Sequence, residues 1–244
     1  MKYGSFEFNV LMKKALVTGA SSGLGKYISI ELSKKKIKVI GIARNKRRLE
    51  ALKKNIGNKY FDYVNFDLKK INEIEKISKI ILQKENFIDI LINNAGIYKH
   101  SNLQDTNISE INDLIDTNLK APIILTKIFS KIMKKKKKGS IINISSIAGK
   151  IPIKNSSVYC GTKFGLHGFS SALNKELKDH GIKIFTIFPG GINTPLWNKI
   201  NYKPGNLNNA LHPKDVFKII DLFLNFKKNV NFNEAVLTPT IENF

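Results

Sequence analysis

Short, nearly continuous apolar runs alternate along this chain with longer stretches in which apolar residues recur every three or four positions. Such runs are typical of strands buried on both faces, and the longer stretches predict amphipathic helices. The predicted strands are residues 15–18, 38–42, 60–66, 87–92, 140–144, 183–188 and an edge strand at 234–239. Strands that alternate with helices predict an α/β fold: a single, doubly wound domain whose parallel sheet of about seven strands carries helices on both faces.

The order of these elements also predicts where function should lie. Residues 1–12 precede the first strand and are interpreted as an N-terminal tail, with Met12 as an alternative start. No linker or repeat divides residues 13–244, so we expect one domain. Ligands of open parallel sheets bind beyond the carboxyl ends of the strands. The short polar segment 195–212 is expected to form a lid there, suited to a small substrate.

A glycine-rich turn at residues 19–25 joins the first strand to a helix. Glycine permits positive φ and lets the backbone approach a pyrophosphate, which binds the unpaired N–H groups of a helix start. A plain strand-to-helix turn would not need three glycines at these spacings. The turn therefore predicts binding of a dinucleotide.

The end of the second predicted strand bears on which dinucleotide is bound. An NAD-binding unit usually has Asp or Glu there, to bond the ribose hydroxyls. This chain has Ala43 followed by Arg44, and its other arginines are Arg47 and Arg48. A guanidinium at Arg44 suits a 2′-phosphate, so we predict NADP(H) as cofactor. Arg47 and Arg48 are expected on the exposed face of the next helix.

Tyr159 and Lys163 are four residues apart in a predicted helix, so their side chains should lie one turn apart on one face. The ammonium of Lys163 is expected to favour the phenolate and to lower the pKa of Tyr159. A tyrosine that exchanges its proton nearer neutral pH is a usable general acid or base. Because packing tyrosines and exposed lysines also occur at this spacing, the interpretation depends on the other motifs.

Composition and charge exclude several classes. No apolar run approaches the about 20 residues of a membrane helix, so no membrane partner is expected. The N-terminus lacks a signal-peptide pattern and the chain has one cysteine, which together predict a cytoplasmic location. The net charge of +22 comes mainly from lysines spread over many segments, so nucleic acid is not predicted as a partner. The four histidines lack metal-ligand spacing, and no metal is predicted.

Taken together, the motifs resemble those of the short-chain dehydrogenase/reductase family, in its single-domain, NADP-preferring branch with a Rossmann-type fold. The resemblance covers roughly residues 13–239. The motifs that carry it, in the family's order and spacing, are Thr18-Gly19-x-x-x-Gly23-x-Gly25, Asn93-Asn94-Ala95-Gly96, Asn118, Ser146, Tyr159-x-x-x-Lys163, and Pro189-Gly190 with Thr194.

The resemblance implies a role for each catalytic position. Tyr159 would protonate the developing alkoxide, and Ser146 would hydrogen-bond the same oxygen. Lys163 would lower the pKa of Tyr159 and bind the nicotinamide ribose, and Asn118 would hold a water that links Lys163 to solvent. Substrate would contact Ser146, Tyr159 and Trp197.

The resemblance also implies the residues that bind the cofactor. They are Gly19, Ser21, Ser22, Gly23, Leu24, Gly25, Arg44, Asp67, Leu68, Asn93, Ala95, Gly96, Tyr159, Lys163, Pro189, Gly190, Ile192 and Thr194. Tyr98, His100 and Ile151 follow strand ends and are further candidates for the substrate pocket.

The implied function is that of an NADPH-dependent oxidoreductase, a carbonyl reductase or alcohol dehydrogenase. It would transfer a hydride between NADP and a small ketone, aldehyde or 3-hydroxy acid, and the family implies a homo-oligomer, either dimer or tetramer. One alternative is a 3-oxoacyl-[acyl-carrier-protein] reductase, because a lysine-rich surface suits an acidic carrier. An alternative of another class is a non-catalytic NADP-binding regulator, although such proteins commonly lose the Tyr or the Lys that this chain retains.

Overall fold

The computed structural model describes residues 12–200, 205–227 and 229–240, and the structural statements below concern these residues. Most of the predicted N-terminal tail lies outside them. Seven parallel strands form one sheet in the order β3-β2-β1-β4-β5-β6-β7. The strands are β1 (Lys14–Thr18), β2 (Lys38–Ala43), β3 (Phe61–Asn65), β4 (Ile90–Asn93), β5 (Gly139–Ile144), β6 (Ile182–Pro189) and β7 (Glu234–Leu237). The predicted doubly wound sheet and its β7 edge strand are confirmed.

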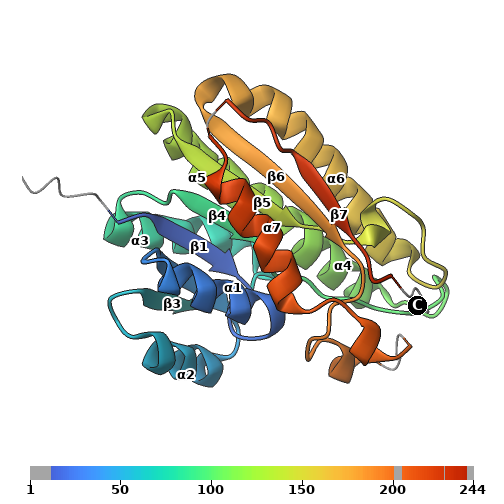
Figure 1. Cartoon of the computed structure of the whole chain (residues 1–244). Helices are drawn as coiled ribbons and strands as arrows, with labels where there is room; N and C mark the ends of the chain where they lie inside the picture. The colour runs from blue at the N-terminus through green and yellow to red at the C-terminus, as the bar shows by residue number, and fades with distance from the viewer. Residues whose placement is uncertain (1–11, 201–204, 228, 241–244) are drawn as a thin grey trace, which may run out of the picture.

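Helices cover both faces of this sheet (Figure 1). Side chains from α1, α2 and α7 pack into one hydrophobic core, and side chains from α3, α5 and α6 pack into the other. The helices are α1 (Gly23–Lys34), α2 (Lys46–Ile56), α3 (Ile74–Glu85), α4 (Ile108–Ile115), α5 (Ala121–Lys136), α6 (Ser157–Leu177) and α7 (Pro213–Asn225).

Strand β1 explains why the predicted strands have so few polar positions. Successive residues of a strand point to opposite faces, so Ala15 and Val17 enter one core while Leu16 enters the other. A strand that supplies two cores must be apolar at every position. The chain leaves β1 for β2 and β3 on one side, and later returns to β4 on its other side. The reversal of direction between β1 and β4 creates the crevice in which such sheets bind ligands.

Several predicted boundaries differ from the structure. The predicted strand at residues 87–92 begins only at Ile90 in the structure. The preceding residue, Asp89, accepts a hydrogen bond from the Lys14 amide through its carboxylate, at 2.9 Å. The helix expected over residues 108–134 is interrupted at residues 116–120 by a π-helical turn, which contains Asn118. Helix α7 was not predicted from the sequence.

Glu85, the last residue of α3, joins the starts of strands β1 and β2. Its buried carboxylate lies 3.1 Å from the Lys14 ammonium and 2.6 Å from the Lys38 ammonium, at the starts of β1 and β2. Burial raises the pKa of Glu85, but hydrogen bonds from Lys38 and Lys14 more than offset this, and the net pKa is lowered.

We expect Glu85→Ala to lower the free energy of unfolding by about 2 kcal/mol, because two partly buried ammonium groups lose the carboxylate that they share. The carboxylate has a lowered pKa in the fold, so its contribution is present above the unfolded pKa and is lost as pH falls. Urea unfolding at several pH values measures both effects. Glu75→Ala, which removes an exposed pair with Lys79, is the control and should change stability by less than about 0.5 kcal/mol. Equal losses in the two variants would contradict the prediction.

Candidate active site

A cavity of about 990 Å³ opens beyond the carboxyl ends of the central strands. The glycine-rich turn after β1 and the end of β2 line one part of it, and the start of α6 lines another. The cavity brings together every predicted site residue except Asn93 and Asn118, and Tyr98, His100 and Ile151 line it as well. Residues from strands far apart in the sequence therefore share one site.

The glycine-rich turn is shaped so that no side chain can replace its glycines without strain. Gly19 and Gly23 have φ of +69° and +52°, a region that L-residues rarely adopt. A Cβ on Gly25 would lie only 2.4 Å from the Gly19 carbonyl oxygen. The Ser22 side chain makes no capping hydrogen bond at the start of α1, so the first N–H groups of this helix have no side-chain acceptor there. This cradle fits the pyrophosphate of a dinucleotide.

The end of β2 presents positive charge to the same cavity. The Arg44 guanidinium is exposed, and its Nη1 lies 3.7 Å from the carboxylate of Asp67. Arg48 also lines the cavity, which the sequence did not indicate beyond placing it on an exposed face. Asn45 caps α2 by accepting a hydrogen bond from the Arg48 amide at 2.9 Å, and this cap places Arg48 in the first turn beside the site.

Among the predicted cofactor ligands, Asn93 is the one that does not line the cavity. It is the last residue of β4, is 1% exposed and does not line the cavity. Its amide donates to the Asn143 side chain at 2.8 Å and to the Thr126 hydroxyl at 3.2 Å. Because neighbouring residues at a strand end point to opposite sides, Asn94 faces the cavity in its place. The side-chain amide of Asn94 donates a hydrogen bond to the Thr18 carbonyl at 2.8 Å, which holds Asn94 in this position.

Asn118 also lies behind the cavity wall. Its side-chain oxygen accepts from the Ile97 amide at 2.9 Å, and its side-chain amide donates to the Ile97 carbonyl at 2.9 Å. The same amide lies 3.2 Å from the Thr162 hydroxyl on α6. Asn118 therefore ties the segment after β4 to the helix that carries Tyr159. The predicted water link from Asn118 to Lys163 stays a prediction.

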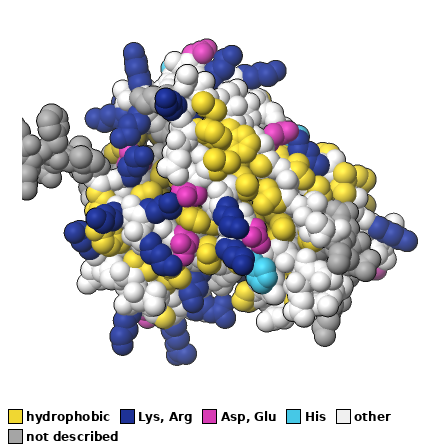
Figure 2. Space-filling view, in the orientation of Figure 1, with side chains coloured by type: hydrophobic (Ala, Val, Ile, Leu, Met, Phe, Trp, Pro, Cys, Tyr) yellow, Lys and Arg dark blue, Asp and Glu magenta, His cyan; other side chains and the backbone are white. Residues whose placement is uncertain are grey.

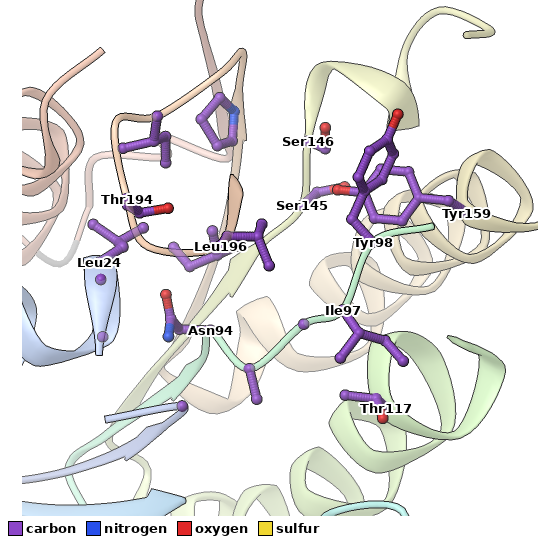
Figure 3. Close-up of a pocket in the computed structure, with 18 of the residues that line it drawn as sticks. Leu24, Asn94, Ile97, Tyr98, Thr117, Ser145, Ser146, Tyr159, Thr194 and Leu196 are labelled. Atoms are coloured by element: carbon purple, nitrogen blue, oxygen red, sulfur yellow. The ribbon is translucent and has the colours of Figure 1, made fainter. Parts of the chain in front are cut away.

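Tyr159, Ser146 and Lys163 meet where β5 ends and α6 begins, with the Tyr159 hydroxyl directed toward the serines that follow β5 (Figure 3). The Lys163 ammonium lies 5.7 Å from the centre of the Tyr159 ring and donates to the Ile144 carbonyl at 3.1 Å. Lys163 is 4% exposed.

The sequence-based expectation of a lowered tyrosine pKa is wrong for this structure. Burial raises the pKa of Tyr159 to about 12, although its hydrogen bond with Ser146 acts in the opposite direction. Burial also lowers the pKa of Lys163 to about 8. Desolvation of the phenolate is the largest cause, and the buried Lys163 ammonium lies over the ring at 5.7 Å from its centre. Tyr159 therefore holds its proton at neutral pH and is suited to donate it.

The remaining wall is mostly apolar and comes from the segment after β6. Trp197 is fixed by a hydrogen bond from its indole nitrogen to the Ile192 carbonyl at 2.7 Å. Leu196, also in this segment, lines the same cavity (Figure 3). The predicted lid at 195–212 includes residues 201–204, which lie outside the described residues, and its described part contains two 3₁₀ turns.

The surface drawn in Figure 2 carries many lysines, but acidic and apolar side chains lie among them, so this face has no continuous basic patch. Several lysines are paired locally, as Lys34 is with Glu31 and Lys120 with Asp116. In the described part of the chain, no helix combines the length and the apolar composition needed to span a bilayer.

The sheet, its crevice and the glycine cradle are those of a dinucleotide-binding α/β protein. The family model for short chain dehydrogenase matches residues 13–205, which is most of the chain. The chain belongs to the short-chain dehydrogenase/reductase family and is an oxidoreductase of that family.

Individual relatives agree with this assignment. An uncharacterized oxidoreductase of Staphylococcus aureus (strain MRSA252) is 32% identical over 93% of this chain and 97% of the relative. A metagenomic short-chain oxidoreductase solved in complex with NADP is 29% identical, with a TM-score of 0.82 over 94% of this chain and 97% of that one. The closed form of a serine dehydrogenase complexed with NADP+ is 29% identical, with a TM-score of 0.83 over 92% and 94% of the two chains.

Proposed function

We propose that this protein is an NADPH-dependent carbonyl reductase or alcohol dehydrogenase, acting on a small ketone, aldehyde or 3-hydroxy acid. The observation that carries the proposal is the placement of Tyr159 beside Ser146 and Lys163, in the same cavity as the glycine cradle. If NADPH binds in the glycine cradle, it would supply the hydride that the carbonyl carbon receives. Tyr159 supplies the proton that completes the alcohol, so the substrate gains one hydride and one proton.

The other side chains support this proton transfer. The Ser146 hydroxyl is placed to hydrogen-bond the substrate oxygen, because it already lies within hydrogen-bonding reach of Tyr159. After Tyr159 gives up its proton, the buried ammonium of Lys163 stabilises the phenolate electrostatically. In the direction of alcohol oxidation the same groups act in reverse, with the phenolate as base.

Positive charge at the end of β2 supports NADPH over NADH. Arg44 and Arg48 both line the cavity there, and Ala43 stands where an acid would repel a 2′-phosphate. Planar guanidinium groups bind phosphate through paired hydrogen bonds. The two 29% identical structures described above are NADP complexes, which agrees with this choice.

We expect Arg44→Ala to raise the KM for NADPH about tenfold and to leave the KM for NADH nearly unchanged, since one charge-assisted contact to the 2′-phosphate is lost. Initial rates with each cofactor at saturating substrate measure this. Arg47→Ala is the matched control, because Arg47 is a neighbouring exposed arginine that does not line the cavity. A wild-type enzyme that prefers NADH would refute the cofactor proposal.

A 3-oxoacyl-[acyl-carrier-protein] reductase is the second candidate, and the net charge of +22 favours it because the carrier is acidic. A carrier-linked 3-oxoacyl substrate should then be reduced far faster than the free acid or its ester, with a strong dependence on salt. Comparing these three substrates at two salt concentrations distinguishes the candidates. A homo-oligomer, dimer or tetramer, stays a prediction from the family.

A further inference from the structure

Tyr98 lies directly against Tyr159 in the cavity. The two ring centres are 4.7 Å apart and the rings meet edge to face at 81° (Figure 3). Edge-to-face packing at this distance is a favourable aromatic geometry. The contact restricts the ring of Tyr159 from the side of the cavity, whereas Lys163 lies over it from the next turn of α6. Tyr98 is therefore placed to set the orientation of the phenol.

Hydrogen bonds fix Tyr98 both at its side-chain hydroxyl and at the backbone of the residue before it. Its hydroxyl lies 3.0 Å from the Ser156 hydroxyl, which is buried and immediately precedes α6, and 3.2 Å from Nδ1 of His100. At the backbone, the preceding residue Ile97 is clamped by Asn118 through two hydrogen bonds of 2.9 Å. A side chain fixed in this way can hold a neighbour in place, since its own position is determined by two separate elements.

Tyr98 also contacts the segment after β6. Its ring centre lies 6.0 Å from that of Trp197, at 70°, and Trp197 is tethered to the Ile192 carbonyl. The ring of Tyr98 thus lies within contact of both Tyr159 and Trp197, and all three side chains line the cavity. A substituent on the substrate carbonyl that points toward this aromatic group would meet the rings of Tyr98 and Trp197.

We propose that Tyr98 positions Tyr159 for proton donation and limits the size of the substituent accepted beside the carbonyl. This inference rests on the proposed carbonyl reduction and adds a residue outside the predicted catalytic and cofactor sets. The ring of Tyr98 carries both effects, through its packing on Tyr159 and the space it fills next to Trp197. Its hydroxyl anchors the ring to Ser156.

The test compares Tyr98→Ala, which removes the ring, with Tyr98→Phe, which keeps it, using 2-butanone and acetophenone as small and bulky ketones. For Tyr98→Ala we expect kcat for 2-butanone to fall about tenfold, because the phenol loses its orientation. We also expect the ratio of kcat/KM for acetophenone over 2-butanone to rise at least about tenfold, mainly through a lower KM for acetophenone. Tyr98→Phe keeps the ring and loses only the hydroxyl contact with Ser156, so both values should change clearly less than in Tyr98→Ala.

Two further readouts make the outcome decisive. Thermal unfolding and NADPH affinity should be nearly unchanged in both variants, which separates an effect on Tyr159 from a general loss of structure. An unchanged substrate ratio in Tyr98→Ala, or a Tyr98→Phe variant as impaired as Tyr98→Ala, would overturn the inference. Failure of the wild-type enzyme to reduce any carbonyl compound would instead refute the proposed function.

Discussion

Replacing Tyr159 by phenylalanine should lower kcat for carbonyl reduction about a thousandfold and leave the affinity for NADPH nearly unchanged. The variant keeps the ring that packs against Tyr98 and loses only the hydroxyl, which is the proposed proton donor. The pKa of about 12 means that the wild-type phenol is protonated throughout the neutral range, so the loss should be similar at each pH there. Oxidation of NADPH over a panel of carbonyl compounds measures the loss, and fluorescence titration measures the affinity.

The matched control is Tyr63→Phe. Tyr63 is on β3, outside the cavity, and its hydroxyl makes only a long contact of 3.4 Å with Glu50. Its removal should leave turnover unchanged. If Tyr159→Phe retains most of the wild-type kcat, the role of Tyr159 as proton donor is refuted. If the wild type binds NADPH tightly and reduces no carbonyl, the hypothesis of a non-catalytic regulator gains support.

The second large effect is expected at Gly25. In Gly25→Ala the new methyl would lie 2.4 Å from the Gly19 carbonyl oxygen and 2.5 Å from the Asn94 side-chain nitrogen. Neither neighbour can move freely, since Gly19 is part of the turn and Asn94 is bonded to Thr18. We expect NADPH affinity to fall at least about a hundredfold and the free energy of unfolding to fall by about 2 kcal/mol. Titration with NADPH and urea unfolding measure the two losses.

Gly168→Ala is the control for Gly25→Ala. Gly168 is an exposed position inside α6, and a Cβ there would meet nothing within 4 Å. Alanine is favoured over glycine within a helix by about 1 kcal/mol, so this variant should bind NADPH normally and be slightly more stable. If Gly25→Ala also binds NADPH like wild type, the turn does not form the pyrophosphate cradle.

The fold could be predicted from the sequence because its signals are local and redundant. The apolar runs around Val17, Ile40 and Ile142 each occur where a doubly wound sheet buries a strand on both faces. The predictions that differed from the structure concern where individual strands and helices begin and end. Strand β4 begins at Ile90 rather than at residue 87, and a π-helical turn around Asn118 interrupts the helix expected over residues 108–134.

The candidate site also contains residues that sequence motifs located and residues whose orientation only the structure showed. Short motifs located the glycine turn, Ser146, Tyr159 and Lys163, because each motif keeps a fixed spacing within a single strand, turn or helix. The same motifs could not tell that Asn93 faces the core and Asn94 the cavity. That choice follows from the register of β4 against β5, where Asn93 pairs with Asn143.

By itself, the sequence indicated the order of the seven strands and of most helices, the glycine-rich turn proposed as the dinucleotide cradle, and the proposed catalytic pair Tyr159 and Lys163, since these follow from local spacing and conformational preference. Only the tertiary structure decided the protonation of Tyr159, the position of Arg48 at the site and the contact between Tyr98 and Tyr159. The physical reason is that pKa values and side-chain contacts depend on burial. Burial is created when segments far apart in the chain pack together, as the segment after β4 does against the start of α6.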